Sequence, residues 1–307
     1  MQIERIGSVM EPKKGNSFLK TISLSNQEFE QTKGFLEAKG QCKAPPFIKQ
    51  TKDLLNNGGR AILIQLESDV YNQFSYEEIH HIGPLLATSI GKPVVQNEQG
   101  DTVISVYDRD RLGSMAKGGR YHQTREGGSI HTDNVNIPEI WDYLILTCLS
   151  PAYVGGESIL VDGIAIHAEL KIKFPRALKV LENNFIWEMR GVKDELYQAP
   201  IITYDENGEP LFRHLRPYME SAHEKAKTPL TKDQLFAVDV LDALTNCSSF
   251  QLRYRLKKGD LLVTRDAQVL HGRTSFSDEL EAVSYEDFHA GKGKVMKRTM
   301  ERLWITK

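Results

Sequence analysis

The segment GGSIHTDNVN, residues 127–136, places His131 and Asp133 on either side of one threonine. In an extended strand, residues i and i+2 point to the same face, so this imidazole and this carboxylate can reach one ion. A second pair of the same spacing, His167 and Glu169, lies in a stretch with helical periodicity. There, side chains two positions apart diverge by about 200° and cannot chelate one ion. The sequence therefore favours His131 and Asp133 as metal ligands and places His167 on a helix surface.

A third ligand is available in DLLVTRDAQVLHGRTSF, residues 260–276. His271 follows an apolar run and precedes Gly272, so we expect it at the end of a strand, facing a cavity. Two histidines and one carboxylate on one face of an octahedral ion leave three positions open, which is the arrangement of non-haem Fe(II) oxygenases. Two of these positions would accept a bidentate 2-oxoacid, and the third would accept O2.

A bound 2-oxoacid also needs a cation for its distal carboxylate. Arg298 and Arg302 are four positions apart in KRTMERLWI, a predicted strand, and so share one face. An arginine fork recognises a carboxylate with two parallel hydrogen bonds, which a lysine cannot do. Exposed strand arginines are the alternative interpretation of this pair, and Arg273, two residues after His271, is a rival for the same role.

Four motifs in this order, HTDN, GGESILVDG, VLHGRTSF and R-x-x-x-R, resemble the taurine dioxygenase (TauD/TfdA)-like family of Fe(II)/2-oxoglutarate-dependent oxygenases. The motifs are similar to those of its γ-butyrobetaine hydroxylase and clavaminate synthase-like members. The resemblance covers roughly residues 60 to 305 and implies Fe(II), 2-oxoglutarate and O2 as the reaction partners. Carried over residue by residue, it implies iron ligands at His131, Asp133 and His271. It also implies 2-oxoglutarate contacts from Ser158 and Arg302, with Arg298 as a companion.

The chain departs from the family pattern in two places. Arg298 and Arg302 follow His271 by 27 and 31 positions, farther than is usual in the family. We interpret the polar stretch 277–296, which lies between His271 and Arg298, as an inserted loop. Arg265 and Asp266 stand where the family commonly has Asp-Asn before the histidine strand. No cysteine cluster occurs that could form an additional zinc-binding domain.

The composition limits the kind of protein. Hydrophobic residues make up 40%, charged residues 26%, and the net charge is −2, values typical of a globular protein. No basic tract suggests nucleic acid as a partner, and no apolar run is long enough for a membrane span. Three scattered cysteines and a charged N-terminus without an apolar segment predict a reduced, cytoplasmic protein. The sequence leaves homo-oligomerisation open.

The periodicity predicts an α+β fold. We expect a strand at 60–66, a helix from Ser75 to Gly91, and then short strands separated by glycine-rich turns. Helices are expected after residue 162, with a break near Pro175, and at 231–246, whereas 209–219 is expected to be irregular or a strand, and 260–270 a strand. Together these elements suggest a double-stranded β-helix (jelly roll) core with a helical insertion.

We expect one oxygenase domain spanning residues 1–307. Within it, an N-terminal α/β flank would occupy residues 1–115, packed outside the core and with its first 45 residues peripheral. The jelly-roll core with its insertion would occupy residues 116–307.

These expectations combine into one function. The chain would hydroxylate, or desaturate, an unactivated C–H bond of a small polar molecule, such as an amino acid or a related amine or carboxylate, releasing succinate and CO2. A redox-silent metal hydrolase and a non-catalytic binding protein on the same barrel are the alternatives. Candidate substrate residues come from GGRYHQTREGG (118–128) and FRHLRPYM (212–219): Tyr121, Gln123, Arg125, Arg213 and Arg216.

Overall fold

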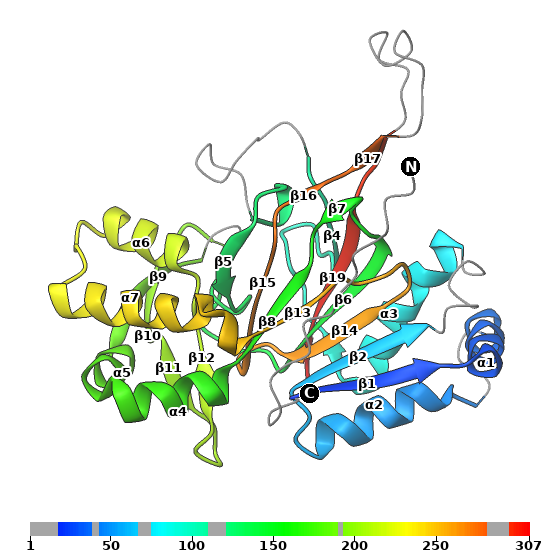
Figure 1. Cartoon of the computed structure of the whole chain (residues 1–307), viewed down its shortest axis with the longest axis horizontal. Coiled ribbons are helices and arrows are strands. Elements are labelled where there is room, and N and C mark those ends of the chain that lie inside the picture. Colours follow the sequence, from blue (N-terminus) through cyan, green and yellow to red (C-terminus); the bar gives the residue numbers. More distant parts are fainter. Residues whose placement is uncertain (1–17, 39–42, 67–74, 110–120, 190–192, 281–294) are drawn as a thin grey trace, which may run out of the picture.

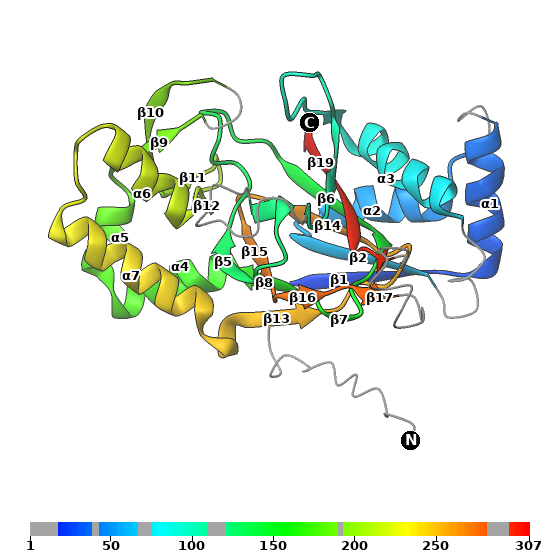
Figure 2. The ribbon, with the colours of Figure 1, turned by 90° about the horizontal axis from the view of Figure 1, so that it is seen from above.

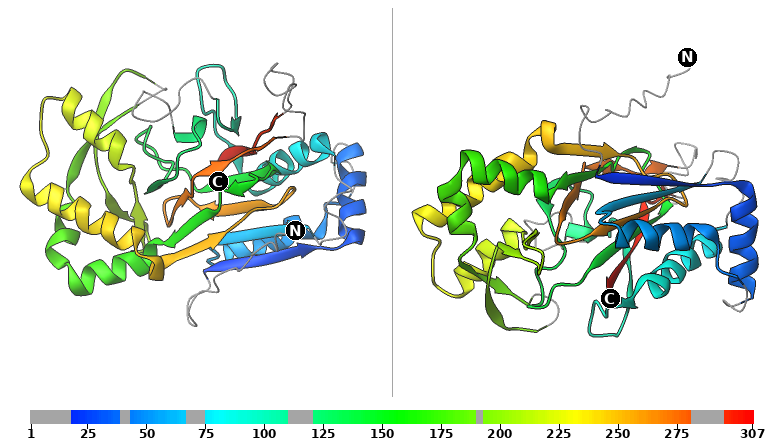
Figure 3. Two further views of the ribbon diagram at one scale, coloured as in Figure 1. Left: turned by 45° about the horizontal axis from the view of Figure 1, so that its top comes forward. Right: turned by 90° about the horizontal axis from the view of Figure 1, so that it is seen from below.

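The computed structural model describes residues 18–38, 43–66, 75–109, 121–189, 193–280 and 295–307. Within these residues, a seven-stranded sheet and a four-stranded sheet form the middle of the molecule (Figure 1). The blue and cyan helices lie at one end and the green and yellow helices at the other, as the views in Figures 2 and 3 confirm. The fold is thus mixed, with largely antiparallel sheets.

The larger sheet has the strand order β1-β2-β14-β6-β19-β3, and β4 also pairs with β19. Only β1 and β2 are parallel, and every other pair in this sheet is antiparallel. The strands rich in Ile, Leu and Val are buried on both faces, as expected for a sheet that is covered on both sides. Its strands are β1 (Leu19–Leu24), β2 (Ala61–Leu66), β3 (Lys92–Pro93), β4 (Val103–Val106), β6 (Tyr143–Ser150), β14 (Leu261–Arg265) and β19 (Thr299–Thr306).

The smaller sheet faces the larger one. Its antiparallel strands follow the order β13 (Gln251–Tyr254), β8 (Ser158–Asp162), β15 (Val269–Arg273) and β5 (Gly128–His131). Leu63 and Leu262 of the larger sheet and Leu160 and Val269 of the smaller sheet belong to one buried cluster. The space between the two sheets is therefore a packed core.

Alternate side chains along the strands of the smaller sheet point to its two opposite faces. Ile159 and Leu270 join a different buried cluster, on the side away from the larger sheet. Side chains alternate along a strand, so His271 shares the inner face with Val269. His271 also pairs directly with His131 in the β15–β5 register. Both imidazoles therefore arise from neighbouring positions on the inner face.

Two helices, α2 (Pro46–Asn56) and α3 (Tyr76–Ile90), cover the outer face of the larger sheet, and α1 (Asn26–Glu37) lies at the end of the sheet, after β1. Phe47 and Leu86 from the helices pack with Ile64 and Leu303 from the strands in one buried cluster. A capping box at Ser75 begins α3, and the C-cap at Gly91 ends it, so the helix predicted between these two residues is confirmed.

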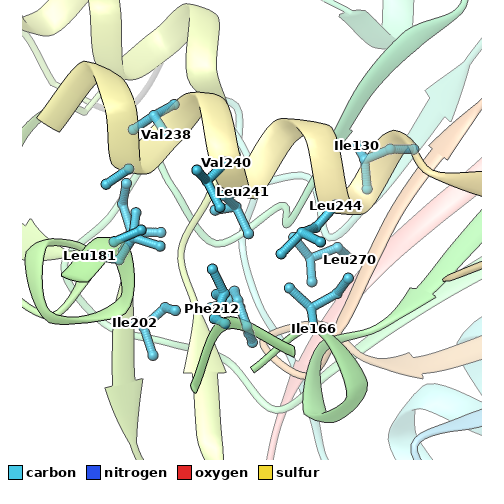
Figure 4. Packing of buried hydrophobic residues seen from close by; sticks show 14 of the residues in the cluster. Ile130, Ile166, Leu181, Ile202, Phe212, Val238, Val240, Leu241, Leu244 and Leu270 are labelled. Carbon is cyan, nitrogen blue, oxygen red and sulfur yellow. The ribbon is translucent and has the colours of Figure 1, made fainter. Parts of the chain in front are cut away.

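A helical lobe lies between β8 and β13 in the sequence. Phe212 and Leu241 lie in its core, which also receives Ile130 and Leu270 from the smaller sheet (Figure 4). The predicted break at Pro175 is confirmed because it separates two helices. The elements of the lobe are α4 (Gly163–Lys173), α5 (Pro175–Leu181), β9 (Asn184–Glu188), β10 (Leu196–Pro200), β11 (Ile202–Tyr204), β12 (Pro210–Phe212), α6 (Arg216–Lys225), α7 (Lys232–Asn246) and a 3-10 turn, η3 (Ser248–Phe250).

Three sequence-based expectations need correction. Strand β1 pairs with β2 along its whole length, so the N-terminal segment continues the larger sheet instead of packing outside it. The predicted single strand at 260–270 is two strands in different sheets, because the chain turns at Asp266–Gln268. The stretch 209–219 contains a short strand, β12, as expected, but its last residues form the first turn of α6, where Pro217 fits because the first helical turn needs no proline N–H.

The expected inserted loop at 277–296 is described only at its ends. Strands β17 (Glu279–Leu280) and β18 (Val295–Met296) pair with each other, and residues 281–294 lie outside the described residues. Next to this hairpin, β16 (Phe276–Ser277) pairs with β7 (Val154–Gly155).

Among the helices that the structure describes, none combines the length and the apolar character that a membrane span requires. Cys148 and Cys247 are free, and Cys42 lies outside the described residues.

Candidate metal centre

His131, Asp133 and His271 converge, with one potential ligand atom from each lying within 4.8 Å of the others. Asp133 Oδ1 is 3.6 Å from His131 Nε2 and 3.8 Å from His271 Nε2. His131 ends β5, and Asp133 follows two residues later in a turn, so the pair converges at the end of the strand as the spacing predicted. The register pairing of β15 with β5 brings in His271.

The two histidines present lone pairs. His131 Nδ1 lies 2.6 Å from the carbonyl oxygen of Ser129, so Nδ1 donates and Nε2 is left as the acceptor nitrogen. Burial and the neighbouring His131 lower the pKa of His271 to about 4, so its imidazole is neutral at neutral pH. Neutral imidazoles are the form that binds metal ions.

Asp133 is ionised in this environment. Burial alone would raise its pKa, but Arg302 and, after it, the two histidines outweigh burial and hold the pKa well below the usual range. Its second oxygen, Oδ2, accepts hydrogen bonds from Arg302 Nη1 at 3.1 Å and from Trp304 Nε1 at 2.9 Å. Only Oδ1 points between the histidine nitrogens.

Asp266, which is fully buried, fixes the turn that carries Asp133. Its Oδ1 accepts from the backbone N–H of Asp133 and its Oδ2 from that of Asn134, both at 3.0 Å. Burial, together with the charge of Asp133, raises the pKa of Asp266. One carboxylate thus ties the turn after β5 to the turn before β15.

The donor set fits a divalent transition metal. It consists of two imidazole nitrogens and one carboxylate oxygen, which suit Fe(II) and related ions. Three protein ligands of this kind would leave further positions of an octahedral ion open.

Two buried arginines, Arg273 and Arg298, lie close together. Arg273 and Arg298 both lie over the ring of Phe276, at 5.4 and 5.2 Å from its centroid. Burial and the neighbouring Arg273 lower the pKa of Arg298 to about 10. The Nε atoms of both arginines are buried and have no hydrogen-bond partner within the described part of the chain. Two guanidinium groups this close to each other favour an anion between them.

The GGES motif, residues 155–158, lies beside Arg298. Gly155 and Gly156 have φ angles of +72° and +70°, which favour glycine. A Cβ atom on Gly156 would lie 3.0 Å from Arg298 Nε, so glycine lets the guanidinium approach the backbone. Ser158 is buried and stands opposite Arg273 in the β8–β15 register, so their side chains share one face.

Arg273 also holds the segment before β5. Its guanidinium donates to the carbonyl oxygens of Tyr121 and Thr124 and lies 4.2 Å from the ring centroid of Tyr121. The Tyr121 hydroxyl accepts from the Arg273 backbone N–H, and its ring meets His131 edge-on. Tyr121 therefore lies beside the metal ligands, whereas residues 110–120 lie outside the described residues.

The other candidate substrate residues make structural contacts. The carbonyl of Gln123 accepts from the backbone of Arg109, and Arg125 binds Asp108 while more than half exposed.

Arg213 is buried and donates to the carbonyl oxygens of Asn134, Ile137 and Pro138, the segment that follows Asp133. Arg216 pairs with carboxylates of α6 and α7. His167 lies on α4, as predicted, and its imidazole contacts the hydroxyl of Tyr204.

Sequence reasoning did not single out Trp304 or Gln96. Trp304 is two positions from Arg302 on β19, so the alternation of a strand could have identified it. Gln96 Oε1 accepts a hydrogen bond from Arg302 Nε at 2.9 Å, and no sequence motif around Gln96 predicts this contact.

Comparison with known proteins identifies the family of this chain. The family model "Taurine catabolism dioxygenase TauD, TfdA family" matches residues 49–300. FR-33289 synthase of Streptomyces rubellomurinus (strain ATCC 31215) is 27% identical over 70% of this chain and 60% of its own length. A uridine-5'-phosphate dioxygenase of Amycolatopsis sp is 28% identical over 45% of this chain and 50% of its own length. The chain thus spans 60% or less of the curated relatives cited here.

Solved structures show the same fold. An asparagine oxygenase in complex with Fe(II), 2S,3S-3-hydroxyasparagine and succinate aligns with a TM-score of 0.68 at 15% identity, covering 93% of both chains. The non-haem iron oxygenase OrfP, in complex with Fe and alpha-ketoglutaric acid, aligns with a TM-score of 0.65 at 17% identity, covering 94% of both chains. Because the family model spans most of the sequence, the chain belongs to the TauD/TfdA family of dioxygenases.

Proposed function

We propose that this protein is an Fe(II)- and 2-oxoglutarate-dependent oxygenase that hydroxylates, or desaturates, a C–H bond of a small polar molecule. The observation that carries the proposal is the convergence of His131, Asp133 and His271, with one carboxylate oxygen facing both histidines. Membership of a dioxygenase family supports it.

The three ligands would hold Fe(II) through neutral Nε2 atoms of His131 and His271 and through Oδ1 of Asp133. Bound Fe(II), together with 2-oxoglutarate and O2, would supply oxidation of a C–H bond coupled to decarboxylation of 2-oxoglutarate to succinate and CO2. The protein's own contribution is to keep the imidazole of His271 unprotonated, to hold the carboxylate in one orientation, and to bury all three side chains.

For the distal carboxylate of 2-oxoglutarate, the geometry favours Arg298 over Arg302. Arg298 is buried, and the Nε of its guanidinium has no hydrogen-bond partner among the described residues. Arg302 already donates to Asp133 and to Gln96. Ser158 would add a hydroxyl, and Arg273, paired opposite Ser158, would add positive charge on the same face. This assignment replaces the sequence-based preference for Arg302.

The substrate class that we propose is an amino acid or a related small amine or carboxylate. The support is by similarity, because solved structures of the same fold contain 3-hydroxyasparagine and (3S)-hydroxy-L-Arg. Of the candidate substrate residues, Tyr121 has the strongest support, because its ring contacts His131. Arg213 has weaker support, because three carbonyl oxygens already occupy it.

We further propose that the two facing sheets form a double-stranded β-helix within a single domain. The shared core between the sheets supports this arrangement. The sequence further predicts a cytoplasmic location and a small molecule, not nucleic acid or a membrane, as the partner. It permits a homo-oligomer.

Anaerobic titration tests the proposal directly. Fe(II) added with 2-oxoglutarate should give a visible charge-transfer band, because an iron-chelated 2-oxoacid absorbs there. Asp133→Ala and His271→Ala should abolish both the band and succinate release. His167→Ala, a change on the surface of α4, is the matched control and should keep both. Full succinate release by Asp133→Ala would refute the metal assignment.

The alternatives give different results in the same experiment. A hydrolase on this barrel would bind Zn²⁺ and show no change on addition of 2-oxoglutarate. A binding protein without turnover would form the band and release no succinate in a screen of amino acids, betaines and small amines.

A further inference from the structure

The two oxygens of Asp133 have different neighbours. Oδ1 faces His131 Nε2 and His271 Nε2. Oδ2 accepts one hydrogen bond from the Arg302 guanidinium and one from the Trp304 indole. The carboxylate is therefore divided into one oxygen on the metal side and one oxygen on the protein side.

Both donors are held in place by further contacts. The Gln96 side chain accepts from Arg302 Nε and donates to the Arg302 carbonyl oxygen. Trp304 stacks on Trp141, with ring centroids 4.0 Å apart and an angle of 15° between the planes. The Arg302 guanidinium also lies 4.4 Å from the centroid of Trp304. Asp133, Gln96, Trp141 and Trp304 are all buried.

Covalent geometry alone does not keep an aspartate in this orientation. The terminal torsion of its side chain has broad, two-fold preferences, so rotation that brings Oδ2 toward the metal costs little by itself. Two hydrogen bonds to one oxygen in a buried site make this rotation expensive, because they involve a charged acceptor that is removed from water. An oxygen that is held this way is not free to become a second metal ligand.

We propose that Arg302 and Trp304 are positioning residues that restrict Asp133 to binding the metal through one oxygen. The proposal rests on the proposed metal centre and adds a role that the family assignment does not give to Trp304. Its consequence is that three coordination positions stay open, whereas a carboxylate that binds through both oxygens would take one of them. This role also explains why Arg302 contacts Asp133 and does not join Arg273 and Arg298 beside Phe276.

The test compares two stacked tryptophans. Trp304→Phe removes the indole N–H that binds Asp133 and keeps an aromatic ring in the stack. Trp141→Phe is the matched control, because the Trp141 indole N–H has no hydrogen-bond partner among the described residues. Co(II) is the probe, added without O2 or 2-oxoglutarate, and its visible absorption reports both affinity and ligand arrangement.

Trp304→Phe should lower Co(II) affinity by about 10-fold or more, the usual effect of removing a hydrogen bond to a metal ligand, and should change the Co(II) spectrum. Trp141→Phe should keep the wild-type affinity and spectrum. An unchanged spectrum in Trp304→Phe, or an equal loss in both variants, would overturn the proposal. If Trp304→Phe does not fold, Arg302→Gln provides the same comparison, with Arg302→Lys expected to restore part of the affinity.

Two outcomes distinguish a wrong metal centre from a wrong role of Trp304. If the wild-type protein does not bind Co(II), the metal centre itself is wrong. If the wild-type protein binds Co(II) and Trp304→Phe matches it in affinity and spectrum, only the restriction of Asp133 is wrong.

Discussion

Arg298 and Arg302 are four positions apart but have separate neighbours. Arg298 lies over Phe276 next to Arg273, and Arg302 contacts Asp133. Arg298 precedes β19, and the pairing of β19 with β6 shifts register between Thr299 and Met300. The regular alternation that made the two arginines look like a pair therefore does not extend from Arg302 to Arg298.

Arg298→Gln should raise the half-saturating concentration of 2-oxoglutarate by about 10- to 100-fold. The reason is that a charge-assisted hydrogen bond contributes about 1.5–3 kcal/mol, which corresponds to that range of affinity. Arg302→Gln should have a smaller effect on 2-oxoglutarate and a larger effect on metal affinity. Titrating 2-oxoglutarate and Fe(II) against both variants separates the roles, and the reverse ranking would return the co-substrate carboxylate to Arg302.

At the scale of elements, the metal ligands depend on how closely β5 approaches the chain after β15. Gly127 precedes β5, and a Cβ atom there would lie 2.4 Å from the backbone nitrogen of Ser275. Backbone atoms cannot move aside as a flexible side chain can. Gly127 is therefore required for the approach that brings His131 opposite His271.

Gly127→Ala should destabilise the fold by about 1–3 kcal/mol, as overpacking does, and should weaken metal binding. Gly34→Ala is the control, because Gly34 lies within α1 with open space around it and should gain up to about 1 kcal/mol. Thermal unfolding and Co(II) titration measure both effects. Wild-type stability and affinity in Gly127→Ala would contradict the requirement for a close approach.

Local signals in the sequence were sufficient for several elements. The capping boxes at Ser75 and Thr231 and the proline at position 175 mark helix boundaries that the structure confirms. The alternating spacing of His131 and Asp133 placed both on one side of a strand end, and the structure brings them within 4.8 Å of each other and of His271. These features depend on neighbours within a few positions.

Features that depend on distant neighbours were not predictable in this way. The chain between Leu261 and His271 reads as one apolar strand, but Asp266 accepts two backbone N–H groups from the turn at Asp133 and marks a change of sheet. Likewise, Gln96 meets Arg302 because β3 and β4, which flank Gln96 in the sequence, both pair with β19 in the larger sheet. Periodicity does not encode such pairings.

At the scale of the whole molecule, one buried acid lies away from the metal ligands. Asp260 precedes β14 and accepts hydrogen bonds from the Lys257 backbone at 2.8 Å and from the Tyr254 hydroxyl at 3.2 Å. Burial raises its pKa to about 6, even though these hydrogen bonds act in the opposite direction. The folded protein therefore binds a proton at this site more tightly than the unfolded chain does.

A raised pKa contributes stability that is fully present below the unfolded value, near 3.8, and is lost as pH rises through about 6. Asp260→Asn should remove this dependence, giving a stability gain on the order of 1 kcal/mol at pH 7–8 relative to the wild-type protein. Unfolding by denaturant at pH 5 and pH 7.5 measures it. Asp53→Asn, at an exposed position of α2, is the control, and an identical pH response in wild type and Asp260→Asn would reject the prediction.

Because His131 pairs directly with His271, the metal centre depends on whether an insertion in β15 contains an odd or an even number of residues. One residue inserted within β15 before His271 would turn its imidazole toward the helical lobe, and two inserted residues would turn it back. Surface loops of the lobe between β8 and β13 can change in length without this effect, because they lie outside the strands that carry the two histidines. Metal binding should therefore be lost when an odd number of residues is inserted within β15 and be restored when the number is even. In the surface loops of the lobe, the number of inserted residues should not affect metal binding.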